Sequence, residues 1–160
     1  MFRGMGVKSI HSGDSLAVDF RMVVRGKGYR KKGSQSMAYL AFVIEDHVDV
    51  SLLYLRALVE AGFQPAIIRD GEEAMARLAK ESPALVILDL HVPKVSGETI
   101  LDYIRSQERL KQTKVIIATG DARYSEADYP KADLFLLKPI TYSQMMDFAD
   151  RFKGTWPARD

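Results

Sequence analysis

The sequence of 160 residues contains no cysteine and only three histidines. The lack of cysteine excludes a disulfide framework and any metal site built on thiolates, and it fits a reducing compartment. No apolar stretch approaches the roughly 20 residues that a membrane helix needs, and the N-terminus lacks the apolar segment of a secretion signal. We therefore expect a cytoplasmic protein without a membrane partner.

Net charge is also low, at +2, but the charges are divided unevenly along the chain. Residues 1–36 hold eight Lys or Arg against two Asp, a net of +6, whereas residues 37–160 hold fifteen against nineteen, a net of −4. We interpret 1–36 as a basic leader that is either disordered or precedes the natural start, 37–154 as one folded domain and 155–160 as a C-terminal tail. No output domain is expected after the folded domain. The segment Arg25–Gly33 could be a nucleic-acid arm, but basic tails are common and we expect no nucleic-acid partner.

Short apolar runs alternate with amphipathic helical patterns from Met37 onward, at spacings of roughly 20–25 residues. This alternation is typical of right-handed βαβ units and predicts an α/β fold, a doubly wound five-stranded parallel sheet. The predicted strands are Tyr39–Ile44, Phe63–Ile68, Ala84–Leu88, Lys114–Ala118 and Ala132–Leu137. The predicted helices are Val48–Ala61, Gly71–Lys80, Gly97–Lys111 and a last one from Thr141 to about Lys153. The first helix should turn one face toward the core, formed by Val48, Leu52, Leu55, Leu58 and Val59.

Four of the predicted strands end in a chemically reactive or charged residue. These ends are Glu45-Asp46, Asp89, Thr119 and Lys138. Because the carboxyl ends of parallel strands lie at one edge of a sheet, these side chains should meet in one crevice. Clustered carboxylates repel one another unless a cation joins them, and an all-oxygen ligand set suits Mg²⁺, with Mn²⁺ as a second option. A carboxylate nucleophile, a divalent cation, a lysine and a hydroxyl are what phosphoryl transfer to an aspartate requires.

Together, these residues resemble the receiver domain of two-component response regulators, and the resemblance covers Met37 to about Lys153. The matching features are the acidic pair after the first strand, the pattern D-x-x-x-P-x-x-x-G from Asp89 to Gly97, Thr119 followed by a small residue, and Lys138-Pro139. Each fragment alone is weak, but their order and their positions on successive strand ends are specific. The resemblance implies a flavodoxin-like strand order 2-1-3-4-5.

The resemblance also implies a role for each matching residue. Asp89 is expected to be the phosphoacceptor, with Lys138 and Thr119 bonding oxygens of the phosphoryl group. The expected metal ligands are Asp46, Asp89 and the main-chain carbonyl of His91, with Glu45 acting through metal-bound water. Phe135 occupies the position of an aromatic switch, although an apolar strand residue can equally be core. The family usually has a cis peptide bond before the proline that matches Pro139.

Two further expectations concern regulation. His91 follows Asp89 by two residues, so we interpret it as a gatekeeper against hydrolytic water, held by Asp121. The segment between Thr119 and Lys138 is about one helical turn shorter than in most receivers, and Pro130 disfavours helix at Tyr129. We therefore predict a shortened fourth helix within Ala122–Asp128, and a monomer or weak dimer.

The predicted function is that of a stand-alone phosphoaccepting receiver, not an enzyme. It would take its phosphoryl group from a histidine kinase or phosphotransfer protein and signal to an unidentified downstream protein. One alternative is an aspartate-nucleophile phosphatase, which usually needs a carboxylate where His91 stands. A protein-binding receiver without phosphorylation is a second alternative, but the acidic cluster and the lysine are both present. A flavodoxin-like nucleotide binder is disfavoured by the acidic loop Glu45–Asp49.

Overall fold

The computed structural model describes residues 38–155. The predicted basic leader and all but the first residue of the predicted tail lie outside the described residues. Five strands are present, β1 (Tyr39–Ile44), β2 (Phe63–Ile68), β3 (Leu85–Leu88), β4 (Lys114–Thr119) and β5 (Leu134–Leu137). The α-helices are α1 (Val48–Glu60), α2 (Gly71–Leu78), α3 (Gly97–Ser106) and α4 (Tyr142–Lys153), and 3-10 turns occur at η1 (Glu108–Leu110) and η2 (Glu126–Asp128). Within residues 38–155, every helix is too short or too polar to cross a membrane.

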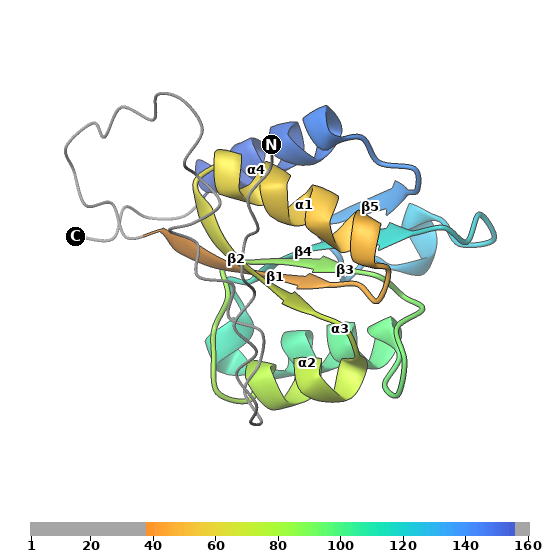
Figure 1. Ribbon diagram of the computed structural model, residues 1–160. Helices are drawn as coiled ribbons and strands as arrows, with labels where there is room; N and C mark the ends of the chain where they lie inside the picture. The colour runs from red at the N-terminus through yellow and green to blue at the C-terminus, as the bar shows by residue number, and fades with distance from the viewer. Residues whose placement is uncertain (1–37, 156–160) are drawn as a thin grey trace, which may run out of the picture. The chain divides into compact units, whose positions relative to one another are not determined.

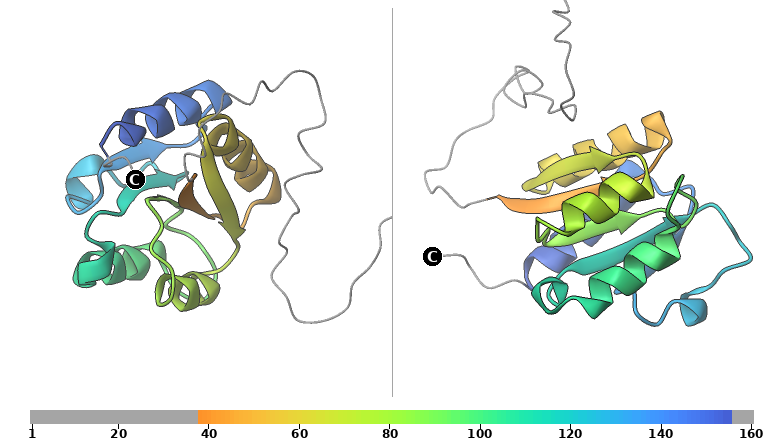
Figure 2. Two further views of the ribbon diagram at one scale, coloured as in Figure 1. Left: turned by 90° about the vertical axis from the view of Figure 1, so that its left-hand side faces the viewer. Right: turned by 90° about the horizontal axis from the view of Figure 1, so that it is seen from below.

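All strand pairs are parallel and the strand order is β2-β1-β3-β4-β5, which confirms the predicted topology. Helices α1 and α4 cover one face of the sheet, and α2 and α3 cover the other (Figure 1). The views in Figure 2 show the resulting three layers. Because β1 and β4 flank β3, the carboxyl end of β3 lies at the middle of the sheet edge where all five parallel strands end.

The buried strand residues alternate between two cores, as a period of two requires. On the α2 and α3 side, the strands contribute Phe42, Ile44, Val86, Leu88, Val115 and Ile117. On the α1 and α4 side they contribute Ala41, Val43, Leu85, Ile87, Ile116 and Ala118. Both faces of the central strands are therefore apolar, which explains why β3 reads as an unbroken hydrophobic run.

Helix starts are fixed by side-chain caps. Asp70 accepts a hydrogen bond from the Glu73 amide at 2.9 Å at the start of α2, and Thr141 forms a reciprocal capping box with Gln144 at the start of α4. These bonds satisfy backbone donors that have no partner inside the helix.

The predicted core face of α1 is wrong in part. Val48 and Leu52 are exposed, with relative accessibilities of 53% and 41%, whereas the buried face is formed by Ser51, Tyr54, Ala57 and Leu58. Helix α1 packs against both the sheet and α4, so its inward face is rotated toward Tyr54. The hydroxyl of Ser51 is satisfied locally by the Val48 carbonyl at 2.8 Å, which lets a polar residue lie in the core.

The segment of the expected fourth helix departs further from a helix than predicted. Residues 120–133, all of them described, contain the single 3-10 turn η2 and no α-helix. A capping box between Ser125 and Asp128 closes this turn. The last helix, labelled α4 in Figure 1, is thus the one expected from Thr141 onward.

Gly97 is required by close packing at the turn after β3. A Cβ atom at this position would lie 2.5 Å from the Asp89 carbonyl oxygen and 2.7 Å from the Leu90 Cα atom. The Gly97 amide also donates to the Leu90 carbonyl at 3.0 Å. The start of α3 is therefore pressed against the backbone that carries Asp89.

We predict that Gly97→Ala lowers the free energy of unfolding by about 1–3 kcal/mol, because the methyl group meets backbone that cannot yield. The matched control is Gly120→Ala, since a Cβ atom there meets nothing within 4 Å. Urea unfolding of both variants measures the difference. Equal stabilities of the two variants would contradict the close approach at Gly97.

Candidate functional site

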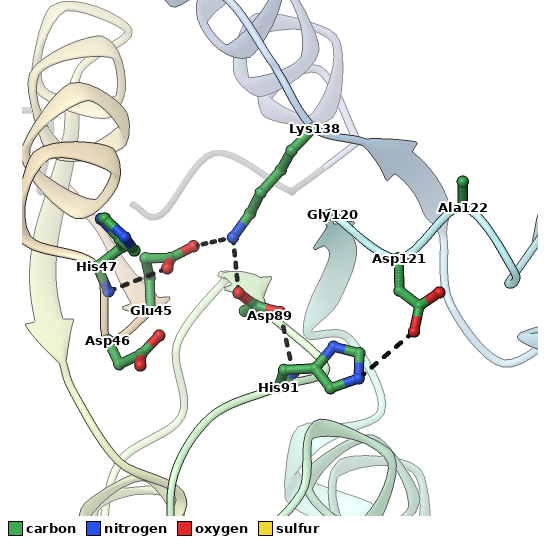
Figure 3. A pocket seen from close by; sticks show the side chains of 9 residues that line it. All are labelled: Glu45, Asp46, His47, Asp89, His91, Gly120, Asp121, Ala122 and Lys138. Atoms are coloured by element: carbon green, nitrogen blue, oxygen red, sulfur yellow. Dashed lines mark hydrogen bonds and ion pairs between the residues drawn. The ribbon is translucent and has the colours of Figure 1, made fainter.

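A hollow lies over the carboxyl ends of β1, β3, β4 and β5 (Figure 3). It is lined by Glu45, Asp46, His47, Asp89, His91, Gly120, Asp121, Ala122 and Lys138. Six predicted site residues are thus brought together from segments up to 93 positions apart. Two others, Thr119 and Phe135, are not among the lining residues.

Asp89 follows the last residue of β3 and is held from both sides. Its backbone amide donates to the Ile44 carbonyl at 3.0 Å, which fixes the main chain against β1. Its Oδ1 atom accepts from the His91 amide at 2.9 Å and its Oδ2 atom accepts from Lys138 Nζ at 2.6 Å. The carboxylate is therefore oriented at the floor of the hollow, with 9% of its side chain exposed.

Glu45 is a buried carboxylate beside Asp89. Its Oε2 atom lies 2.5 Å from Lys138 Nζ, and its Oε1 atom accepts from the His47 amide at 3.1 Å. Burial raises the pKa of Glu45 above its ordinary value, although Lys138 and the His47 amide oppose the shift. Burial alone would lower the pKa of Lys138, but its bonds to Asp89 and Glu45 outweigh this effect and raise it. The lysine is consequently held in its charged form.

Three carboxylates share this corner of the molecule. Ligand oxygens of Glu45, Asp46 and Asp89 all lie within 4.8 Å of one another. Lys138 is the one cation paired with this group among the described residues, and its ammonium bonds Glu45 and Asp89. Negative charge therefore exceeds positive charge, and the oxygen-only ligand set is the type that Mg²⁺ prefers.

Thr119 is the last residue of β4 and is completely buried. Its hydroxyl accepts a hydrogen bond from the Asp121 amide at 3.2 Å. Its carbonyl accepts from the Lys138 amide at 2.8 Å, so the backbones that carry Thr119 and Lys138 are directly bonded. The adjoining Lys138–Pro139 peptide bond is cis.

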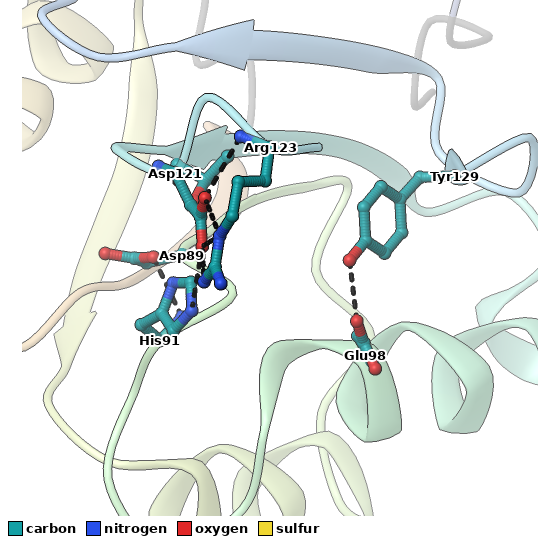
Figure 4. A network of polar contacts seen from close by, with 7 residues as sticks. Asp89, His91, Glu98, Asp121, Arg123 and Tyr129 are labelled. Carbon is teal, nitrogen blue, oxygen red and sulfur yellow. Dashed lines mark hydrogen bonds and ion pairs between the residues drawn. The ribbon is translucent and has the colours of Figure 1, made fainter. Parts of the chain in front are cut away.

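His91 and Asp121 face each other at the rim, with His91 Nε2 and Asp121 Oδ2 3.7 Å apart (Figure 4). A shorter pair that the sequence did not indicate involves Arg123. Its Nη2 atom lies 2.6 Å from Asp121 Oδ2, and its Nε atom donates to Asp121 Oδ1 at 2.9 Å. These bonds hold the pKa of Asp121 far below its usual range. In the sequence, only the spacing D-x-R could have indicated this ion pair, and that spacing is too common to be specific.

Phe135 lies on the α2 and α3 side of the sheet and is partly buried against that core. Its ring stacks on Tyr129, with centroids 5.9 Å apart and an interplanar angle of 8°. In the sequence, Tyr129 indicates only the limit of a helix, because it precedes Pro130. In the structure, Tyr129 is buried, with a relative accessibility of 8%.

Comparison with known proteins agrees with this arrangement. The response regulator receiver domain family matches residues 41–150. A probable methanogenesis regulatory protein of Methanothrix harundinacea is 28% identical, over 74% of this chain and 83% of its own.

The phosphorylated form of a cyanobacterial phytochrome response regulator has a TM-score of 0.60 at 26% identity, over 74% and 94% of the two chains. A receiver domain of a Pseudomonas aeruginosa sensor histidine kinase, solved with magnesium in its active site cleft, has a TM-score of 0.65. At 18% identity, over 73% of this chain and 98% of that one, it shows the fold alone.

The chain belongs to the response regulator receiver domain family. Receiver domains are signalling domains of two-component systems and not enzymes of the usual kind. They interact with histidine kinases or phosphotransfer proteins and with downstream partners.

We predict that Asp46→Asn raises the melting temperature of the metal-free protein, because it removes repulsion among the three carboxylates. Asp46 is exposed, so the gain is screened by water and should be about 1 kcal/mol, or roughly 4 °C. Thermal unfolding in the presence of a chelator measures it. The control is Asp147→Asn, an equivalent change at an exposed position of α4. A melting temperature for Asp46→Asn no higher than that of this control would contradict a repulsive cluster.

Proposed function

We propose that this protein is a receiver that accepts a phosphoryl group on Asp89 from a histidine kinase or phosphotransfer protein. The observation that carries the proposal is the pairing of Asp89 with Lys138 at 2.6 Å, next to two further carboxylates at an open hollow. Within the described residues, this hollow is where a nucleophile, a fixed cation and a metal-ligand set coincide.

Mg²⁺ is the proposed cofactor, with Mn²⁺ as a possible substitute. Asp46, Asp89 and the His91 carbonyl would hold the ion, with Glu45 acting through water. The excess of carboxylates over ammonium groups supports this assignment, because a divalent cation restores charge balance. When bound, the ion neutralises charge on the phosphoryl oxygens.

In the proposed transfer, a carboxylate oxygen of Asp89 forms the new bond to phosphorus. The bond between phosphorus and the donor histidine nitrogen breaks, and its electron pair stays on the imidazole, which takes up a proton. Lys138 stabilises charge on a phosphoryl oxygen, and the Thr119 hydroxyl turns to bond another. The product is an aspartyl phosphate.

Among the alternatives, no observation favours the aspartate-nucleophile phosphatase. Such an enzyme needs a general acid beside the nucleophile, and the residue two positions after Asp89 is His91. The His91 amide donates to the Asp89 carboxylate, while 54% of its side chain is exposed at the rim. We infer that this side chain obstructs water and slows loss of the phosphoryl group. The carboxylate of Asp121 is paired with Arg123, so it is poorly placed to act as a general base in such an enzyme.

We also propose a cytoplasmic location, a monomer or weak dimer, a downstream protein partner, and no nucleic-acid partner.

We predict that Asp89 is the only phosphorylated residue and that its modification requires a divalent cation. Incubation with acetyl phosphate and Mg²⁺, followed by intact mass measurement, should show one phosphoryl adduct. Asp89→Asn should abolish the adduct, because the amide lacks a nucleophilic carboxylate oxygen. Asp147→Asn, on the exposed side of α4, should keep it. An Asp89→Asn protein that gained the group at the wild-type rate would refute the assignment.

A further inference from the structure

The connection between β4 and β5 buries an aromatic side chain although it lacks a regular helix. Residues 120–133 contain only the turn η2, yet Tyr129 just after it is 8% exposed. A tyrosine on a surface connection is expected to be held by specific contacts when it is this deeply buried. Its contacts therefore indicate what the segment does.

Tyr129 joins three elements. Its ring stacks on Phe135 of β5 at 5.9 Å between centroids and meets the Tyr124 ring edge-on at 5.6 Å. Its hydroxyl donates to the Glu98 carboxylate of α3 at 2.6 Å (Figure 4). Burial and this carboxylate raise the pKa of Tyr129, so the hydroxyl stays protonated as a donor. One side chain thus ties the connection to both β5 and α3.

The far end of the connection has further attachments to α3. Lys131 Nζ lies 2.6 Å from Asp102 Oδ1, and the Lys131 carbonyl accepts from Arg105 Nε at 2.7 Å. Arg105 also pairs with Asp133 at 2.7 Å. Residues 129–133 are consequently fixed to α3 by independent polar contacts in addition to the Tyr129 ring.

The near end of the connection begins at the acceptor site. The Asp121 amide donates to the Thr119 hydroxyl at 3.2 Å. The Tyr124 ring lies 6.3 Å from the His91 ring between centroids, beside the hollow. A turn of the Thr119 hydroxyl toward a phosphoryl group on Asp89 would break its bond to the Asp121 amide and release this attachment of residues 120–124.

We propose that Tyr129 is a positioning residue, a latch that holds residues 120–133 in the unphosphorylated arrangement and thereby opposes phosphorylation of Asp89. The proposal rests on the proposed function. The contacts of Lys131 and Asp133 hold only the last residues of the connection. Tyr129 extends the attachment toward the acceptor site through its bond to Glu98 and its ring contact with Tyr124, so Thr119 can move only against that restraint. Phe135 is also covered by the Tyr129 ring, so it cannot leave its position unless the latch opens.

The sign of the effect follows from a population shift. If the latch stabilises the arrangement that does not accept the phosphoryl group, loosening the latch raises the population of the competent arrangement, and the phosphorylation rate rises in the same proportion. A residue that only supports the fold behaves differently, because its loss lowers stability without promoting the reaction. Stability and phosphorylation must therefore be measured on the same variants.

The experiment compares three changes in the latch with one control. Tyr129→Phe removes the hydroxyl and keeps the ring, Glu98→Gln keeps an acceptor oxygen without the charge, and Tyr129→Leu removes the aromatic stack. Tyr103→Phe is the control, since Tyr103 is another tyrosine partly buried against the same core. Each full-length protein is treated with acetyl phosphate and Mg²⁺, and both the adduct formation rate and the melting temperature are recorded.

We expect Tyr129→Phe to be phosphorylated about fivefold faster than wild type while melting at a lower temperature. Glu98→Gln should show a smaller increase, because its amide oxygen still accepts the hydroxyl, and Tyr103→Phe should match wild type. Tyr129→Leu should show the largest increase in the adduct formation rate. If Tyr129→Leu does not fold, the rate of Tyr129→Phe still tests the latch.

The outcomes separate the two proposals. Absence of an adduct on the wild-type protein overturns the proposed function, and the latch with it. A wild-type adduct with an unchanged or slower rate in Tyr129→Phe overturns the latch alone and leaves Tyr129 with a structural role. As an independent readout, amide hydrogen exchange in residues 121–133 should accelerate on phosphorylation of the wild type, while exchange in β3 should not. Equal protection before and after phosphorylation also overturns the latch.

Discussion

The structure depends on one electrostatic constraint, the burial of two carboxylates that share a single ammonium group. Glu45 is 1% exposed and Asp89 7%, and Lys138 contacts both at 2.5 and 2.6 Å. Buried charges are tolerated only when they are paired and hydrogen-bonded, and here backbone amides of His47 and His91 complete the set. With Asp46 added, the group keeps more negative than positive charge, and this excess makes the site a candidate for a divalent cation and for phosphoryl chemistry.

The fold satisfies this constraint through parallel strand ends and tight backbone contacts. Strands β1, β3 and β5 deliver the two carboxylates and the lysine to one edge of the sheet, although these residues are far apart in sequence. The turn after β3 is fixed by Gly97, which has no room for a side chain. The connection from β4 to β5 begins directly after Thr119, and Tyr129 anchors that connection to α3.

Much of this arrangement could be predicted from the sequence because it follows from local patterns. Buried parallel strands give unbroken apolar runs, and the parallel rule places their polar end residues together. What could not be predicted depends on long-range side-chain packing. The inward face of α1 is set by its contact with α4, which puts Ser51 inside and Val48 outside. Asp121, Arg123 and Tyr129 lie in a segment without a periodic pattern, and Glu98 lies on the separate helix α3. No sequence pattern therefore identifies the pairs Asp121–Arg123 and Tyr129–Glu98.

The most direct test of the charge imbalance is the dependence of wild-type stability on Mg²⁺ concentration, measured by urea unfolding at constant ionic strength. An ion that binds only the folded state stabilises it by mass action. Above the dissociation constant, the free energy of unfolding should rise by about 1.4 kcal/mol for each tenfold increase in Mg²⁺. The same series with Lys138 intact and Asp46 and Asp89 both changed to Asn should be flat. A wild-type stability that does not respond to millimolar Mg²⁺ would contradict the account.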